Sequence, residues 1–294
     1  MIHIIITSYG EPEPTLKCVE SFLSQKIREP HKITVIDPFQ KIERLLKEKY
    51  KNKIDFFLDP GEGKSYALNL FLEKIYSQDK NDIIIFTDGD VHVSKNSVQE
   101  ILNPFKDEKV GCVTGKPVCI DKKNNLFGFW SHLVFEGIHR VRTRLSKEEK
   151  FMECSGYLFA IRNSILRGFP LEVSEDGIIP YLFWKEGYKI KYAPTAEVYV
   201  LNNYNWKKWK KQKIRNIKGH ENYNTIAPEM PRTKSFFNEI KEGTLFALKY
   251  PNNMKERYWT ALLFAARLHI YLKAFYDIKL KKKKYEDAFR ADYY

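Results

Sequence analysis

The stretch "DIIIFTDGDVHV" (82–93) joins an apolar run to two aspartates and a histidine that are spaced two residues apart. The run at 83–86 has the composition of a buried strand. Alternate residues of an extended segment point the same way. Asp88, Asp90 and His92 could therefore share one Mn²⁺ or Mg²⁺ through carboxylate oxygens and an imidazole nitrogen. They could equally form a turn in which the aspartates bond to the backbone, so this stretch alone leaves both interpretations open.

Strand-like and helix-like segments alternate around this stretch over the first 95 residues. Strand-like runs stand at 1–7, 32–37, 54–59 and 82–88, and helix-like runs at 13–25, 40–50 and 65–78. This order with short loops predicts an α/β fold with a doubly wound, mostly parallel sheet. Ligands of such sheets bind at the carboxyl ends of the strands. The polar residues at those ends are Thr7, Ser8, Asp37, Asp59 and Asp88.

The alternation loosens after about residue 95. Further strands are expected at 111–120, 151–162 and 188–200, and a loop that enters a helix at 174–187. Beyond residue 202 the chain becomes basic, and its last fifty residues have a helical pattern.

Composition narrows the classes of protein. The hydrophobic residues make up 43% of the 294 residues, which excludes global disorder. The net charge of +13 favours polyanionic partners, namely phosphorylated ligands, nucleic acid or an anionic membrane surface. No CxxC pair occurs among the four cysteines, so we expect reduced, buried thiols and a cytoplasmic location. The sequence contains no run of about 18 uncharged apolar residues, so we expect no membrane-spanning helix.

Two short motifs each allow a structural and a chemical interpretation. "GEGKS" (61–65) resembles a P-loop, but that motif requires a glycine where Leu58 stands. Lys64 could contact a diphosphate or only begin a helix. In "VSEDG", Glu175 and Asp176 could supply favourable charges to the first turn of a helix. Asp176 could instead act as a general base for a hydroxyl group.

A basic segment begins after residue 205. Gln212 and Arg215 would share one helical face, where Arg215 could bind a diphosphate or belong to a solvated surface. The "WKKWKK" sequence (206–211) mixes aromatic and cationic residues, as single-stranded nucleic acid sites do. However, Trp206 and Trp209 lie one helical turn apart, as packing or sugar-stacking residues also would.

Six motifs follow one another in a defined order: "TSYG" (7–10), "GKSYALN" (63–69), "TDGD" (87–90), "CSGYLFAIR" (154–162), "SEDG" (174–177) and "QKIRN" (212–216). This order resembles the inverting family-2 glycosyltransferases with a GT-A fold, the group that includes cellulose, hyaluronan and chitin synthases. The resemblance covers about the first three quarters of the chain. It implies a GT-A fold, a nucleotide-sugar donor and Mn²⁺ or Mg²⁺ as cofactor.

The resemblance also implies roles for the matching residues. Residues expected to hold the nucleotide sugar are Thr7, Ser8, Asp37, Gly63, Lys64, Asn69, Asp88, Gln212 and Arg215. The expected metal ligands are Asp88 and Asp90, with His92 where some family members carry a further ligand. Asp176 matches the catalytic base, and Glu175 is its acidic neighbour. The resemblance divides the chain into a catalytic domain at 1–201, with a nucleotide-sugar half (1–95) and an acceptor half (96–201), and a helical extension at 202–294.

Two departures from the family pattern limit the reaction. Asn216 stands where the polymerising synthases close their QxxRW motif with tryptophan, and the spanning helices of those synthases are not expected here. We therefore expect non-processive transfer. The resemblance favours a UDP-sugar as donor, with GDP and dTDP as alternatives, and the acidic pair of "SEDG" favours a hydroxyl of a glycan or lipid-linked glycan as acceptor. Alternatives are transfer to a polyprenyl or dolichyl phosphate, a sugar nucleotidyltransferase, or a basic RNA- or membrane-binding module without activity. Under the main interpretation no nucleic acid partner is expected.

The C-terminal region carries one more expectation. Residues 258–280 would form a helix with a wide apolar face and a narrow polar stripe of Arg267, Lys273 and Asp277, followed by the basic run "KLKKKK" (279–284). Such a helix could lie on the anionic inner face of the cell membrane. It could also pack on the catalytic domain.

Overall fold

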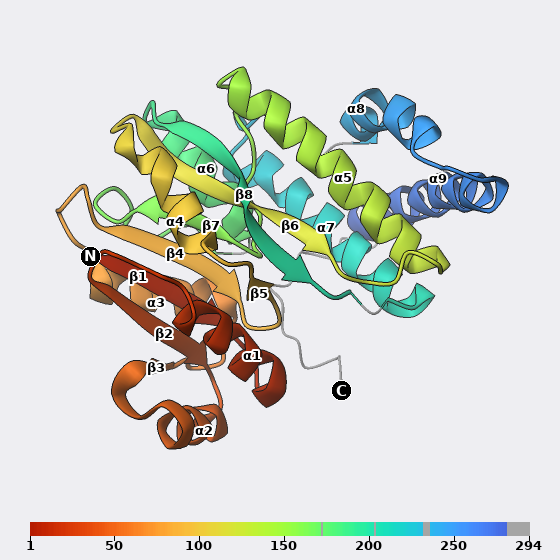
Figure 1. Cartoon of the computed structure of the whole chain (residues 1–294). Helices are drawn as coiled ribbons and strands as arrows, with labels where there is room; N and C mark the ends of the chain where they lie inside the picture. The colour runs from red at the N-terminus through yellow and green to blue at the C-terminus, as the bar shows by residue number, and fades with distance from the viewer. Residues whose placement is uncertain (172, 203, 232–235, 281–294) are drawn as a thin grey trace.

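The computed structural model describes residues 1–171, 173–202, 204–231 and 236–280 (Figure 1). Its strands are β1 (Ile2–Thr7), β2 (His31–Asp37), β3 (Asp55–Leu58), β4 (Ile83–Asp88), β5 (His92–Val93), β6 (Val110–Cys119), β7 (Phe159–Arg162) and β8 (Lys189–Val200). Its α-helices are α1 (Pro12–Leu23), α2 (Gln40–Tyr50), α3 (Lys64–Ile75), α4 (Ser97–Leu102), α5 (Leu126–Lys147), α6 (Glu175–Lys185), α7 (Trp206–Ile226), α8 (Phe236–Lys249) and α9 (Met254–Phe275). Short helical turns are η1 (Lys51–Lys53), η2 (Asn103–Lys106) and η3 (Tyr276–Leu280).

The strands form one eight-stranded sheet in the order β3-β2-β1-β4-β7-β6-β8-β5. The pairs β2/β3, β1/β2, β1/β4 and β6/β8 are parallel, whereas β7 runs antiparallel to both of its neighbours. The expected α/β fold with a mostly parallel sheet is therefore confirmed. The four strands of the first half give the alternation that the sequence showed.

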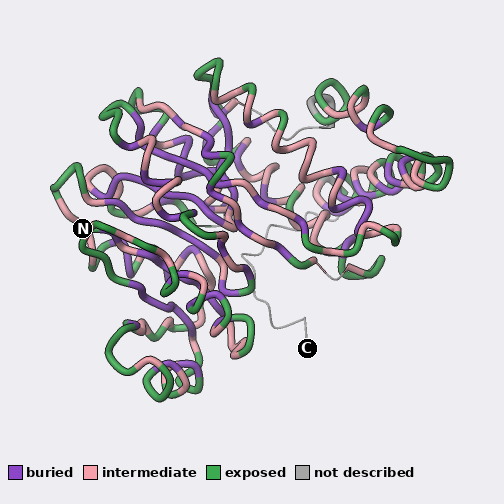
Figure 2. The backbone as a smooth tube through the Cα atoms, in the orientation of Figure 1, coloured by how far each residue is buried: buried purple, intermediate pink, exposed green. Residues whose placement is uncertain are grey.

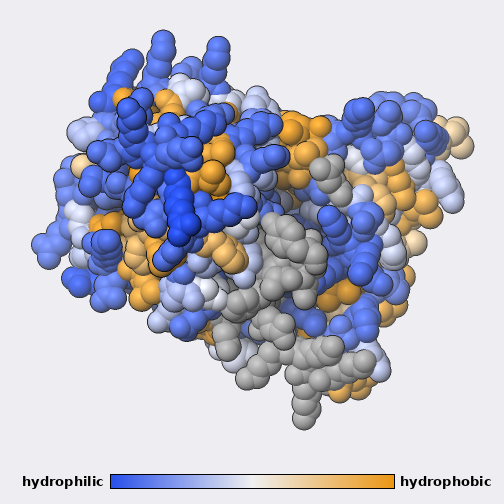
Figure 3. Space-filling view, turned by 90° about the horizontal axis from the view of Figure 1, so that it is seen from below, coloured by the Kyte–Doolittle hydropathy of each residue, from blue (hydrophilic) through white to orange (hydrophobic). Residues whose placement is uncertain are grey.

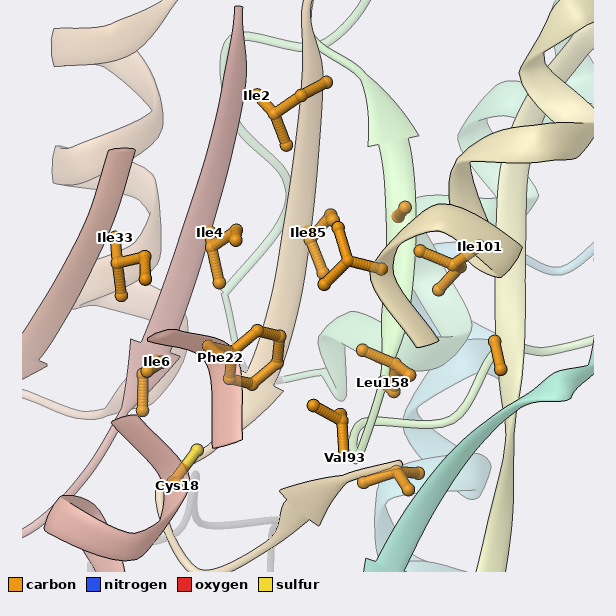
Figure 4. Close-up of a cluster of buried hydrophobic side chains, with 14 of the residues drawn as sticks. Ile2, Ile4, Ile6, Cys18, Phe22, Ile33, Ile85, Val93, Ile101 and Leu158 are labelled. Atoms are coloured by element: carbon orange, nitrogen blue, oxygen red, sulfur yellow. The ribbon is translucent and has the colours of Figure 1, made fainter. Parts of the chain in front are cut away.

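Helices cover both faces of the sheet. Alternate residues of β1 point to opposite faces: Ile4 and Ile6 pack with α1, α2 and α4, whereas Ile5 packs with α3 and α6. Figure 4 shows part of the first cluster, where Ile4, Ile85 and Phe22 gather between the sheet and α1. Buried backbone follows the strands, and exposed backbone follows the outer helices and loops (Figure 2).

A third cluster lies outside this sandwich. It joins α5 to α7, α8 and α9 through buried residues that include Phe129, Trp130, Trp209 and Ile270. The C-terminal helices thus pack on α5, and the helical pattern expected for the last fifty residues is confirmed over the described part. The division of the chain at residue 201 stays a prediction, because α7 to α9 share a core with α5.

Two elements differ from expectation. No element was predicted for residues 126–147, which form the 22-residue helix α5, begun by Asn125 as its N-cap. The strand expected over 151–162 is confined to β7. Residues before it use their backbone amides elsewhere: Cys154 N–H donates to Asp176 O, and Ser155 N–H to Thr114 Oγ1. These bonds hold the loop against α6 and β6 in place of a strand pairing.

Among the described residues, no helix combines the length and hydropathy that crossing a bilayer requires. All four cysteines are buried thiols, as expected.

Candidate active site

The carboxyl ends of β1, β2 and β4 meet because these strands are parallel neighbours. Thr7 pairs in register with Ile36 on one side and with Asp88 on the other. Asp37 is fully buried at the end of β2, where its Oδ2 accepts from Ser8 Oγ at 2.6 Å and from Gly10 N–H at 2.8 Å. Its Oδ1 accepts from Phe39 N–H at 2.8 Å. Asp37 therefore shapes the two loops that edge the expected nucleotide pocket.

The Asp88-Gly89-Asp90 turn lies directly against the end of β1. Gly89 N–H donates to Thr7 O at 2.7 Å, and a Cβ on Gly89 would lie only 2.7 Å from Ser8 Cβ. Only glycine permits this close approach. The turn therefore presents Asp88, which is half-buried, and Asp90, which is exposed, beside Thr7 and Ser8.

Lys64 connects this edge of the sheet with the second acidic motif. It is the first residue of α3, after Gly63 with φ of +110°. Its Nζ lies 2.6 Å from Asp88 Oδ1 and also forms an ion pair with Glu175 Oε1. Burial alone would lower the pKa of Lys64, but the carboxylates of Asp88 and Glu175 outweigh it and raise that pKa. Lys64 is thus a charged bridge between residues 87 positions apart in the two halves of the chain.

Glu175 and Asp176 lie in the first turn of α6, where the helix dipole favours negative charge. Burial raises the pKa of Glu175, Lys64 opposes this rise, and the carboxylates of Asp176 and Asp88 add to it. The Asp176 carboxylate accepts from Ser174 Oγ and, at 3.3 Å, from Gly156 N–H. These two donors fix the orientation of the carboxylate that the sequence indicated as the base.

Tyr157 lies between the two acidic motifs, which the sequence analysis missed: its backbone oxygen accepts from Thr87 Oγ1 at 2.8 Å, and the preceding Gly156 N–H donates to Asp176. Burial of its hydroxyl raises its pKa well above the usual range, and nearby Tyr204, Asp90, Asp88 and Asp176 raise it further. The hydroxyl therefore lies within electrostatic reach of both acidic motifs. Only its place in "CSGYLFAIR", between the glycine and the strand β7, could have indicated it from the sequence.

Helix α7 contacts the segment that carries the acidic pair. Tyr223 donates from its hydroxyl to Ser174 O at 2.9 Å, directly before the acidic pair. Gln212 accepts a hydrogen bond from the Tyr204 hydroxyl, so it reaches the neighbourhood of Tyr157 through Tyr204. Arg215 lies one turn further along α7 and is half-buried. Contacts of Gln212 and Arg215 with a donor stay predictions.

Asn69 is committed to a loop. Its Nδ2 donates to Phe169 O at 2.8 Å, and its Oδ1 accepts from Phe169 N–H at 2.9 Å. These bonds hold the Phe169 loop against α3, and each amide atom keeps a second hydrogen-bonding position. The donor contact implied by the family pattern stays a prediction.

The expected three-ligand metal site is not assembled. Within the described residues, no three His, Cys, Asp or Glu side chains converge as such a site would require. His92 lies in β5, where its ring packs 5.2 Å from the ring of Tyr199, and burial lowers its pKa. Asp88 and Asp90 remain suited to a hard divalent cation that takes its other ligands from a diphosphate and water. A metal-ligand role of His92 stays a prediction, as do the roles of the two aspartates that would hold the ion.

Comparison with known proteins supports the resemblance to family-2 glycosyltransferases that the sequence motifs indicated. Residues 2–219 match the profile of "Glycosyltransferase like family 2". A probable glycosyltransferase, YdaM of Bacillus subtilis, is 27% identical over 55% of this chain and 39% of its own. An N-acetylglucosaminyltransferase of Azorhizobium caulinodans is 25% identical over 68% of this chain and 54% of its own. The O-antigen chain rhamnosyltransferase WbaN of Salmonella anatum is 28% identical over 44% of each. The chain thus spans about half the length of these relatives or less.

Solved structures show the same fold. GalNAc-T7 with UDP, GalNAc and Mn²⁺ aligns with a TM-score of 0.51 at 16% identity, over 85% of this chain and 58% of the other. Residues 1–349 of S. aureus TarS in complex with UDP-GlcNAc align with a TM-score of 0.51 at 12% identity, over 88% and 78%. At these identities the likeness concerns the fold, which is the expected GT-A type. With three quarters of its length matched by the family profile, the chain belongs to glycosyltransferase-like family 2.

Proposed function

We propose that the protein is an inverting, metal-dependent glycosyltransferase that moves one sugar from a UDP-sugar to a hydroxyl of a glycan or lipid-linked glycan. The observation that carries this proposal is the Lys64 bridge between Asp88 at the donor edge and Glu175 beside the expected base. It joins the strand end at which we expect the nucleotide to the acidic pair. The UDP complexes of the two structural neighbours support a UDP-sugar donor.

The chain's own residues suggest how the reaction proceeds. Thr7, Ser8 and Asp37 would hold the nucleoside at the strand ends. A bound Mn²⁺ or Mg²⁺, held by Asp90 and Asp88, would supply charge stabilisation for the leaving diphosphate. Lys64 would add a cation at the same place.

Asp176 would take the proton of the acceptor hydroxyl as that oxygen attacks the anomeric carbon from the face opposite the diphosphate. The new C–O bond forms as the bond to the diphosphate breaks, so the sugar is inverted. Ser174 Oγ and Gly156 N–H would keep the carboxylate aimed at the acceptor. A single displacement needs no covalent sugar intermediate.

A panel of nucleotide sugars tests this proposal. UDP-sugars with Mn²⁺ should give transfer or slow hydrolysis, and NMR should show an anomeric configuration opposite to that of the donor. Asp90→Ala should abolish the increase in melting temperature that UDP gives only with Mn²⁺. A product of retained configuration, or a metal-dependent shift that survives in Asp90→Ala, would contradict the proposal.

Transfer to a lipid phosphate is the second candidate, since such an acceptor is already an anion and needs no base. The donors that orient Asp176 favour a hydroxyl acceptor. Equal turnover of the wild-type protein and Asp176→Asn with a polyprenyl phosphate would favour this second candidate instead.

A further inference from the structure

Helix α9 has two apolar faces, of which the described residues cover only one. The covered face carries Thr260, Leu263, Ala266, Ile270 and Ala274, which are all buried. Three of these residues belong to the cluster shared with α5 and α7. This face accounts for the attachment of α9 to the rest of the molecule.

Two of the three residues of the polar stripe expected on this helix, Arg267 and Asp277, face neighbouring helices. Arg267 pairs with Glu239 of α8, with its Nε 3.1 Å from Glu239 Oε2. Asp277, in η3, is buried and lies 3.0 Å from Lys273 and 3.7 Å from Lys218 of α7. Helices α7 and α8 thus form ion pairs with polar groups of α9 and η3, which on an ordinary surface helix would face water.

The outer face of α9 is consequently apolar. Met254, Tyr258, Leu268, Leu272 and Phe275 are exposed by 75%, 63%, 49%, 62% and 61%. Their spacing of three, four or ten residues places them along one side of the helix. The neighbouring helix α8 adds Leu245 and Leu248, exposed by 72% and 60%. Figure 3 shows hydrophobic surface at its right side, where these helices lie.

Basic and aromatic residues adjoin this apolar face. Lys255 and Arg257 are exposed beside Met254 and Tyr258 at the start of α9. The exposed Trp206 of α7 stacks on Trp209, and its ring centre lies 6.1 Å from that of His269. Helix α7 carries seven lysine and arginine residues against one glutamate. Tryptophan and cationic residues next to exposed leucines are typical of surfaces at the boundary between water and an anionic bilayer.

We propose that the outer face of α9, with α8 and the start of α7, binds the surface of a bilayer that contains anionic lipids. The helix would lie in the plane of the interface with its leucines in the acyl region and its cations among the headgroups. The positive charge next to the apolar face selects an anionic bilayer as its occupant. The basic run expected at 279–284 falls mostly outside the described residues and is not needed for this surface. The proposal does not depend on the transfer chemistry.

Vesicle flotation of the full chain tests the surface. Wild-type protein should float with vesicles of phosphatidylcholine and 30% phosphatidylglycerol (about one lipid in three), and less with phosphatidylcholine alone. Leu268→Glu/Leu272→Glu should lower the partition coefficient about tenfold or more, since it removes two apolar anchors and adds negative charge. Lys255→Glu/Arg257→Glu should lower binding to the anionic vesicles only, and added salt should reproduce this loss in the wild type.

Leu23→Glu/Leu70→Glu is the matched control, because these leucines are exposed by 36% and 37% on α1 and α3. It should float like the wild type, and melting curves should show that all variants are folded. Recovery of wild-type protein in the soluble fraction at every lipid composition would overturn the proposal. So would equal flotation of all variants. A dimer that only Leu268→Glu/Leu272→Glu dissociates, without vesicle binding, would assign the face to a second copy of the chain.

Discussion

The two halves of the site are positioned in different ways. On the donor side, parallel register alone places Thr7, Asp37 and Asp88 together at neighbouring strand ends. On the acceptor side, Asp176 is oriented by the 154–156 loop and by α7, through contacts between segments 20 to 49 residues apart. The donor half is thus set by the pairing of strand ends and the acceptor half by loop and helix contacts. Lys64 is the residue that joins them.

Of the changes considered, replacing Lys64 should lower the free energy of unfolding most. Lys64→Met would leave the half-buried Asp88 and the buried Glu175 without their shared cation, and loss of one partner from a buried charged group costs roughly 3–5 kcal/mol. Denaturant unfolding measures this cost. A loss below about 1 kcal/mol would show that the two halves do not depend on Lys64.

The loss of stability in Lys64→Met should depend on pH. Without Lys64 to oppose it, burial would hold the folded-state pKa of Glu175 further above its unfolded value. A carboxyl group whose pKa is raised in the folded state lowers the stability of the folded protein as pH rises from the unfolded-state pKa to the folded-state pKa. The deficit of Lys64→Met relative to wild type should therefore be smaller at pH 5 than at pH 7.5. Lys64→Arg is the control that keeps the charge, and an equal deficit at both pH values would contradict the explanation.

Changes at the α6–α7 contact should have a smaller effect. A Cβ on Gly177 would lie 2.2 Å from the Tyr223 hydroxyl, so Gly177→Ala should displace that ring and cost about 1–3 kcal/mol. Tyr223→Phe should cost about 1 kcal/mol through the lost bond to Ser174 O. The double variant should lose less than the sum of the single losses, which a double-mutant cycle measures. Strict additivity would mean that α7 does not position the start of α6.

Substitution at His92 should have the smallest effect. Phenylalanine can keep the ring contact with Tyr199, so His92→Phe should change melting temperature and Mn²⁺-dependent UDP binding only slightly. Asp90→Ala is the comparison. Loss of metal-dependent UDP binding in His92→Phe, as expected for Asp90→Ala, would identify His92 as a metal ligand.

These differences also explain what could be predicted from sequence. The period-two apolar runs and the aspartates at strand ends predicted β1 to β4 and the donor edge, because alternation can be recognised within a short segment and neighbouring parallel strands end at one edge of a sheet. Helix α5, the position of Tyr157 and the loop before β7 were missed, since each is fixed by side-chain and loop contacts with other segments. The polar stripe of α9 was recognised, but its inward direction was not, because Glu239 and Lys218 that face it belong to other helices.

The central claim is that Asp176 serves the acceptor in the same site where Asp88 and Asp90 hold the donor. The most direct test is a paired measurement on Asp176→Asn: titration with UDP and Mn²⁺, and single-turnover transfer from the preferred donor. The account predicts an unchanged dissociation constant for UDP and a rate of transfer lowered by about 10²–10⁴-fold, the usual contribution of a general base. Retained transfer, or loss of UDP binding along with transfer, would contradict it.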